Sequence, residues 1–331
     1  MRRREFIALI GGAAAAWPLT TRAQQPDRVR RLGVLMGLES SDVQQREELA
    51  ALKEELQKLG WTDGRNIRIY SRWGDSDADE TWASAKELVD LKPDVIFAHT
   101  TSAVSALAQQ TRSIPIVFVL VSDPVGNGFV ESWTRPGGNI TGFTDFEAPM
   151  AGKWLELLKK AAPRLTQVAL LFNPETAPGG GSIFLDPIEK AAPAFGLNWL
   201  AASARHADEI ETIVGALGRH GGTGLLVTPD IFTTAHRERI ITLAGRYQLP
   251  SIYAYRYFAT DGGLMSYGMD PMDQCRQAAG YINRILKGAV AGELPIQAPT
   301  RLELVINLRT AKALGLEVSQ TILALADAVI E

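Results

Sequence analysis

The stretch that decides the fold runs from residue 94 to residue 121 and reads DVIFAHTTSAVSALAQQTRSIPIVFVLV. It contains an apolar run of strand length, a polar loop, an amphipathic stretch and a second apolar run, over 94–98, 99–101, 102–111 and 114–121. Strands buried on both faces of a parallel sheet have near-continuous apolar runs, and they alternate with helical patterns. The segment therefore predicts one strand–helix–strand unit of an α/β fold.

The same four-part pattern returns in the second half of the chain, as GLLVTPDIFTTAHRERIITLAGRYQLPSIYA over 224–254. In both copies an X-Pro pair opens the second strand: Ile114-Pro115 in the first and Leu249-Pro250 in the second. The apolar run 32–36 has a counterpart in 168–172. We therefore predict an α/β protein of two related, doubly wound parallel-sheet lobes.

The boundaries follow from composition and turn signals. Arg135-Pro136-Gly137-Gly138 is a strong turn signal, and a new helical pattern starts near Met150. We expect an N-terminal lobe over 30–145, a C-terminal lobe over 146–270 and a tail over 271–331 that crosses back over both. Within the tail, 319–329 is expected to form an amphipathic helix.

The first 25 residues have the pattern of an export signal, with Arg2 to Arg4 before a short Ala-rich apolar stretch and a cleavage site after Ala23. The Arg3-Arg4 pair resembles the twin-arginine motif, although the general export route stays open. Cleavage removes a net charge of +3 from a chain of −3, so the mature charge would be −6. No cysteine lies near the cleavage site to carry a lipid anchor, so we expect an exported protein without an anchor. Such a protein is useful only where it cannot diffuse away, which indicates the periplasm.

Composition narrows the chemistry. The formal charge of −3 argues against binding nucleic acid through phosphate contacts. One cysteine cannot form an internal disulfide or a Cys-based zinc site, and the four histidines do not have metal-ligand spacing. Neither a Gly-x-Ser-x-Gly elbow nor a Gly-x-Gly-x-x-Gly loop after the first strand is present. We therefore expect a binding protein without catalytic residues, cofactor or metal.

Polar residues follow the predicted strands, where α/β sheets bind their ligands. Small hydroxyls, carboxylates and tyrosines are suited to a small polar or zwitterionic molecule, although helix caps and turns are the structural alternative for each. Tyr253, Tyr255 and Tyr257 alternate and are expected on one face of a strand. The candidate ligand-binding residues are Glu39, Ser40, Thr100, Thr101, Ser102, Ser122, Asp123, Asn173, Glu175, Asp230, Tyr255, Tyr267 and Asp270.

Several motifs together resemble those of the ABC-transporter substrate-binding proteins, of the type that includes tryptophan- and tyrosine-binding members. They are Ser-Asp-Pro-Val, Pro-Gly-Gly-Asn-Ile-Thr-Gly, Gly-Gly-Leu-Met-Ser-Tyr-Gly and a tail segment, at 122–125, 136–142, 262–268 and 299–316. The resemblance implies a type I periplasmic-binding-protein fold, in which the two lobes are joined by a hinge and clamp a ligand between them. It also implies a membrane permease and an ATPase as partners. The family's ligand loops match here at Ser122-Asp123 and at 100–102, whereas Asn173-Pro174-Glu175 matches only in its Asn-Pro.

The expected function is the periplasmic solute-binding component of an ABC-type importer, taking an amino acid or an aromatic-acid-like solute, and acting as a monomer. A periplasmic sensor that reports to a membrane receptor is the first alternative. An exported hydrolase is the least favoured, because the sequence lacks a convergent acid, base and nucleophile.

Overall fold

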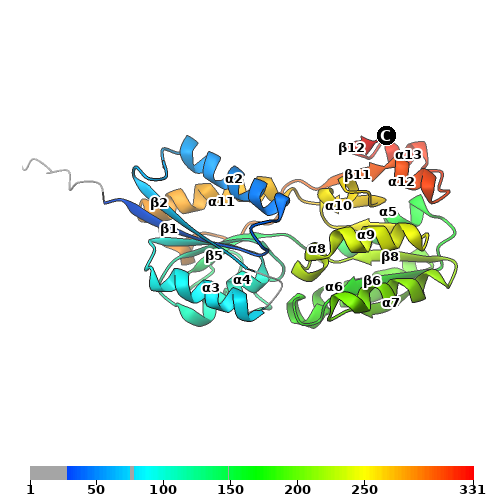
Figure 1. The fold of residues 1–331 in the computed structure, drawn as a ribbon, viewed down its shortest axis with the longest axis horizontal. Coiled ribbons are helices and arrows are strands. Elements are labelled where there is room, and N and C mark those ends of the chain that lie inside the picture. Colours follow the sequence, from blue (N-terminus) through cyan, green and yellow to red (C-terminus); the bar gives the residue numbers. More distant parts are fainter. Residues whose placement is uncertain (1–27, 75–77, 148) are drawn as a thin grey trace, which may run out of the picture.

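The computed structural model describes residues 28–74, 78–147 and 149–331, and the predicted export signal lies outside them. Two sheets, each covered by helices on its faces, lie one after the other along the long axis of the molecule (Figure 1). We call the part built on the five-stranded sheet the N-lobe and the part built on the seven-stranded sheet the C-lobe. The α/β class and the two-sheet architecture predicted from the sequence are confirmed.

The N-lobe sheet is parallel throughout and has the order β2-β1-β3-β4-β5. Its central strands are fully buried apolar runs, as the sequence predicts for strands covered on both faces. The strands are β1 (Arg30–Met36), β2 (Ile67–Trp73), β3 (Val95–His99), β4 (Ile116–Val121) and β5 (Ile140–Thr144). The helices between them are α2 (Val43–Lys58), α3 (Ala78–Asp90) and α4 (Thr101–Gln110).

The C-lobe sheet has the order β12-β11-β10-β9-β8-β6-β7 and is mostly parallel, with one antiparallel pair, β10 and β11. Its strands are β6 (Gln167–Phe172), β7 (Asn198–Ser203), β8 (Thr223–Val227), β9 (Ser251–Tyr253), β10 (Met265–Gly268), β11 (Glu303–Asn307) and β12 (Ala328–Ile330). Its helices include α5 (Pro149–Ala161), α6 (Ser182–Ala191), α7 (Ala207–Gly218), α8 (Ile231–Ala235), α9 (Arg237–Arg246), α10 (Arg256–Thr260), α12 (Leu308–Ala313) and α13 (Gln320–Leu323).

The internal parallel seen in the sequence is confirmed by the strand order. The neighbours β2-β1-β3-β4 of the N-lobe correspond to β7-β6-β8-β9 of the C-lobe. The unit β3-α4-β4 therefore has its counterpart in β8, the helices after it and β9, where the repeated sequence pattern lies.

Three local predictions were wrong. The amphipathic stretch of the second copy, which the repeated pattern predicts as one helix, forms two helices, α8 and α9, that meet at His236. The helix expected over 319–329 is a single turn, α13, followed by the strand β12, because the sheet edge at β11 takes up the last residues. The three tyrosines do not share a strand: β9 ends at Tyr253, and the chain turns into α10 around Tyr255.

The last part of the chain visits both lobes. Helix α11 (Pro271–Leu286) lies beside α2 and packs on β4 of the N-lobe (Figure 1). The chain then passes through a short turn of 3-10 helix at Ala291–Glu293 and returns to the C-lobe as β11 and β12. The chain thus passes between the lobes after β5, after β10 and before β11.

Glycines allow close backbone approach at two of these passages. A Cβ at Gly142 in β5 would lie 2.1 Å from the carbonyl oxygen of Phe118. A Cβ at Gly268, the last residue of β10, would lie 2.0 Å from the carbonyl oxygen of Ala254. Both glycines end motifs singled out in the sequence, and their role there is to let neighbouring backbones meet.

Candidate functional site

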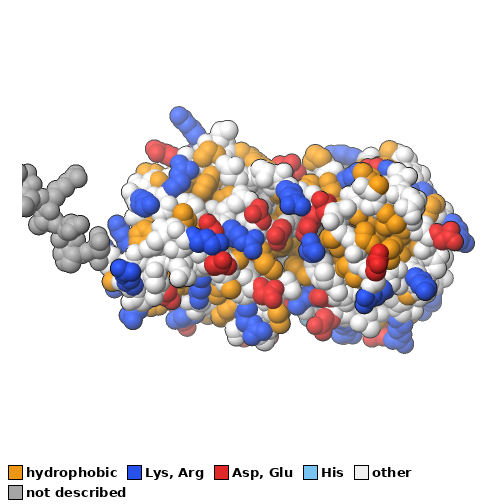
Figure 2. All heavy atoms as spheres, turned by 90° about the horizontal axis from the view of Figure 1, so that it is seen from above, with side chains coloured by type: hydrophobic (Ala, Val, Ile, Leu, Met, Phe, Trp, Pro, Cys, Tyr) orange, Lys and Arg blue, Asp and Glu red, His pale blue; other side chains and the backbone are white. Residues whose placement is uncertain are grey.

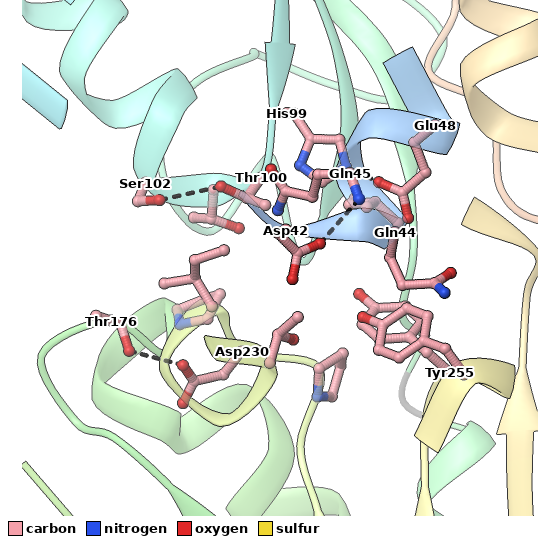
Figure 3. Close-up of a pocket in the computed structure, with 17 residues that line it drawn as sticks. Asp42, Gln44, Gln45, Glu48, His99, Thr100, Ser102, Thr176, Asp230 and Tyr255 are labelled. Atoms are coloured by element: carbon pink, nitrogen blue, oxygen red, sulfur yellow. Dashed lines mark hydrogen bonds and ion pairs between the residues drawn. The ribbon is translucent and has the colours of Figure 1, made fainter. Parts of the chain in front are cut away.

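A cavity lies between the two lobes at the carboxyl ends of their strands, and side chains of both lobes line it (Figure 3). The N-lobe wall consists of Asp42, Gln44, Gln45, Glu48, His99, Thr100, Thr101, Ser102 and Leu120. The C-lobe wall consists of Thr176, Pro178, Pro229, Asp230, Ile231, Thr234, Tyr255 and Tyr257.

The N-lobe wall presents hydroxyls and the start of a helix. Thr100 precedes α4 with a φ of +86°, and its hydroxyl lies 3.0 Å from that of Ser102. The Thr100 side chain makes no capping hydrogen bond to this helix of ten residues. An uncapped helix N-terminus carries free N–H groups and partial positive charge, which favour an anionic group. This part of the wall therefore offers hydroxyls and backbone N–H groups, beside the carboxylates of Asp42 and Glu48.

The C-lobe wall is different, because its carboxylate already accepts hydrogen bonds from residues of the same lobe. Asp230 is buried and accepts hydrogen bonds from the backbone N–H groups of Asn173 (2.8 Å) and Phe232 (2.7 Å) and from the Thr176 hydroxyl (2.7 Å). Burial raises the pKa of this carboxyl, and the hydrogen bonds counteract part of the rise. Asp230 thus caps α8 and fixes the loop after β6 (Figure 3).

A second buried carboxylate, Asp145, connects the lobes at the first passage of the chain. It accepts hydrogen bonds from the hydroxyls of Ser122 in the N-lobe (2.7 Å) and Tyr255 in the C-lobe (2.8 Å). Burial raises the pKa of the Asp145 carboxyl. Burial also raises the pKa of the Tyr255 hydroxyl well above the usual value, and the negative charge of Asp145 adds to that rise. Asp145 is not among the candidate residues predicted from the sequence. The sequence feature that could have indicated it is its position directly after β5, the strand that contains the end of the Pro-Gly-Gly-Asn-Ile-Thr-Gly motif.

An ion pair also joins the lobes beside the cavity. The Arg237 guanidinium of α9 lies 2.7 Å from Asp42, which caps α2, and the two side chains are only 12% and 11% exposed. Arg237 also lies 3.4 Å from Asp261 and stacks over the Tyr257 ring at 5.7 Å. The polar loop before α2 was expected to face a ligand, but its last residue, Asp42, bonds to the opposite lobe.

The structure brings five of the candidate residues to the cavity: Thr100, Thr101, Ser102, Asp230 and Tyr255. Glu39 lines an adjoining hollow beside Arg237, and Ser40 is exposed. Ser122 lies behind the wall and bonds to Asp145.

The remaining five make local structural contacts. Asp123 accepts from the backbone N–H of Gly126 (2.8 Å) in a turn, Glu175 pairs with Arg205 (3.3 Å), and the Asn173 side chain bonds to backbone on both sides. Asp270 caps α11 and lines a separate hollow with Arg301. Tyr267 accepts a hydrogen bond from Trp154 through its carbonyl (2.6 Å). Caps and turns, the structural alternative, account for most of this group.

A second hollow continues from the cavity along the gap between the lobes. It shares Thr101, Ser102 and Thr176 with the cavity and adds the aromatic side chains of Trp82 and Phe129. The candidate residue Glu175 also lines this hollow. Trp82 is 45% exposed, so its ring is accessible from this hollow. The combined space therefore has a polar inner part and an aromatic outer part.

Elsewhere the surface is mixed. On the face drawn in Figure 2, acidic and basic side chains alternate over both lobes. Among the described residues, no helix has both the length and the apolar character needed to cross a membrane.

Comparisons with known proteins agree with this architecture. A tyrosine-binding protein of Clostridioides difficile is 27% identical over 263 residues, which cover 79% of this chain and 74% of that protein. A Streptococcus structure in complex with L-Trp has a TM-score of 0.84 at 22% identity, covering 91% of this chain and 99% of that one. The ligand-free, open structure of an adhesive substrate binding protein from Clostridium difficile has a TM-score of 0.67 at 24% identity, covering 91% and 99%.

These structures share the fold. The family model described as ABC transporter substrate binding protein matches residues 40–330. That range includes every residue lining the inter-lobe cavity. The chain belongs to the family of ABC transporter substrate-binding proteins.

Proposed function

We propose that this protein is the periplasmic solute-binding component of an ABC-type importer and that its lobes close on an amino acid or an aromatic-acid-like solute. The observation that carries the proposal is the inter-lobe cavity, in which strand-end residues of two separate sheets face one space. A membrane permease and an ATPase would receive the loaded protein, which would act as a monomer after export and signal cleavage near Ala23.

The chemistry of the walls supports a solute with a carboxylate. Among the described residues, no lysine or arginine lines the cavity, so the carboxylate would be held by the hydroxyls of 100–102 and the first turn of α4. The adjoining Trp82 and Phe129 would contact an aromatic portion. Relatives named for tyrosine binding and crystallised with L-Trp make aromatic amino acids the first solutes to examine.

The proposal is tested by thermal unfolding with a panel of solutes. The panel contains L-Trp, L-Tyr and L-Phe, the same rings with a carboxylate but no ammonium, and neutral sugars as controls. A solute at 100 times its Kd stabilises the protein by about 2.7 kcal/mol, which raises the melting temperature measurably. Stabilisation by a carboxylate-bearing member and none by the sugars is expected; no shift with any aromatic solute would contradict the proposal.

Transport itself needs a cellular measurement. Deletion of the gene should abolish uptake of the solute that stabilises the purified protein, and the wild-type gene should restore it. Unchanged uptake together with tight binding would favour the sensor alternative, in which the closed form contacts a receptor.

A further inference from the structure

Three side chains with metal-binding atoms meet under the N-lobe wall of the cavity. Glu48 comes from α2, His99 from the end of β3 and Cys275 from α11, and all three are at least 96% buried. One ligand atom of each lies within 4.8 Å of those of the other two. We propose that Glu48, His99 and Cys275 form a site for one divalent cation of the Zn²⁺ type.

The donor set suits such an ion. Carboxylate oxygen, imidazole nitrogen and thiolate sulfur are the protein ligands that Zn²⁺ takes, and three of them leave a coordination position open. One thiolate and one carboxylate also balance the charge of a divalent cation, which a buried site requires. Since Glu48 and His99 line the cavity and Cys275 lies behind them, the open position would face the cavity.

A second observation at His99 points the same way. Its Nε2 lies 2.6 Å from Glu48 Oε2, whereas its buried Nδ1 has no hydrogen-bond partner among the described residues. Because Glu48 Oε2 already lies beside Nε2, an ion bound at that nitrogen would be within reach of both residues and would replace the hydrogen bond between them.

The ligand positions are fixed by regular structure. Gln274, next to Cys275, accepts from the backbone N–H of Leu120 (3.1 Å) and donates to the carbonyl of Thr144 (2.6 Å), which anchors α11 on the N-lobe. Sequence spacing did not predict the site, because residues 48, 99 and 275 are far apart and meet only when α11 returns to the N-lobe. The site depends on these three residues and not on which solute the cavity takes.

The test uses Zn²⁺ and Co²⁺ alone with the purified full chain. Calorimetry with Zn²⁺ should show one ion per chain, and bound Co²⁺ should show the near-ultraviolet charge-transfer absorption of a thiolate ligand. Cys275 is the only cysteine of the chain, so this absorption can come from no other residue. Absence of one-to-one Zn²⁺ binding, or bound Co²⁺ without the thiolate absorption, would overturn the proposal without recourse to any variant.

Variants then assign the ligands. Cys275→Ala should abolish the thiolate absorption, and Glu48→Gln and His99→Gln should each weaken Zn²⁺ binding at least tenfold, with folding checked by circular dichroism. His220→Ala, at an exposed histidine of the C-lobe, is the matched control and should bind Zn²⁺ as the wild type does. Wild-type Zn²⁺ affinity in folded Cys275→Ala would refute the assignment.

Discussion

The two walls of the cavity are built from corresponding parts of corresponding lobes, yet they use their polar residues differently. After β3 the N-lobe presents Thr100 and Ser102, whose hydroxyls bond to each other and face open space. After β8 the C-lobe presents Asp230, whose oxygens accept hydrogen bonds from three donors of the same lobe. The same place in the fold is thus free to bind in one lobe and rigidly structural in the other.

The largest expected effect breaks the rigid wall. Asp230→Ala leaves the backbone N–H groups of Asn173 and Phe232 buried without acceptors, and we expect a loss of about 3 kcal/mol in the free energy of unfolding. Urea denaturation measures it. Glu175→Ala is the control, because this exposed side chain makes only a surface ion pair and should cost less than about 0.5 kcal/mol. Equal losses in the two variants would mean that Asp230 is not structural.

The next largest effect is expected from breaking the ion pair that joins the two walls. Arg237→Gln removes the charge that Asp42 pairs with across the gap, and a double-mutant cycle with Asp42→Asn should give a coupling of about 2 kcal/mol. Small-angle X-ray scattering should show a larger radius of gyration for either single variant, because the lobes lose a contact that holds them at their present separation. Arg256→Gln removes an ion pair to Glu303 within the C-lobe and should leave the radius unchanged. An unchanged radius in Arg237→Gln would show that the pair does not hold the lobes together.

A smaller effect is expected from changing the N-lobe wall of the cavity. Ser102→Ala removes a hydroxyl from the N-lobe wall, and affinity for the solute identified by the panel should fall about five- to tenfold, the equivalent of about 1 kcal/mol. The free energy of unfolding should stay within about 0.5 kcal/mol of the wild type, because the neighbouring Thr100 hydroxyl can still turn to water. Ser113→Ala, exposed beyond the far end of α4, should change neither quantity. Calorimetry that finds undiminished affinity in Ser102→Ala would remove this wall from the binding site.

The smallest expected effect concerns pH and the residue between the walls. Burial raises the folded-state pKa of Asp145 above its unfolded value, so the carboxyl proton is bound more tightly in the folded protein than in the unfolded chain. Its contribution to stability is therefore largest below about pH 4 and falls as the pH rises through the folded pKa. Asp145→Asn should lose this dependence, so that its stability relative to the wild type improves as the pH rises across that range. A stability difference independent of pH would contradict the raised pKa.

The fold was largely predictable because its signal is local and repeated. Two copies of one strand–helix–strand pattern, each with an X-Pro strand entry, predicted two related α/β lobes, and the matching strand orders agree. The errors lie where tertiary context decides: Tyr253, Tyr255 and Tyr257 alternate as in a strand, but β9 stops after the first of them and the chain turns into α10.

The candidate site was predictable by place and less so by residue. The rule that ligands bind beyond strand ends led to the loops after β3 and β8, which the structure brings to one cavity. The same rule also selected Asp123 and Asp270, which accept hydrogen bonds in a local turn and a helix cap, because a side chain's hydrogen-bond partners are not visible in sequence. Asp145 and Arg237 were missed because their partners come from the other lobe.

The sequence by itself determined the class of fold, the pairing of two related lobes and the edge of each sheet at which a solute would be held, since these depend on apolar periodicity along the chain. Only the tertiary structure decided which carboxylates accept hydrogen bonds from their own lobe and which face the cavity. It alone brought together Glu48, His99 and Cys275, which span 227 positions of the chain. The physical reason is that burial and hydrogen-bond partnership arise between segments, when the tail returns as α11 and the lobes meet.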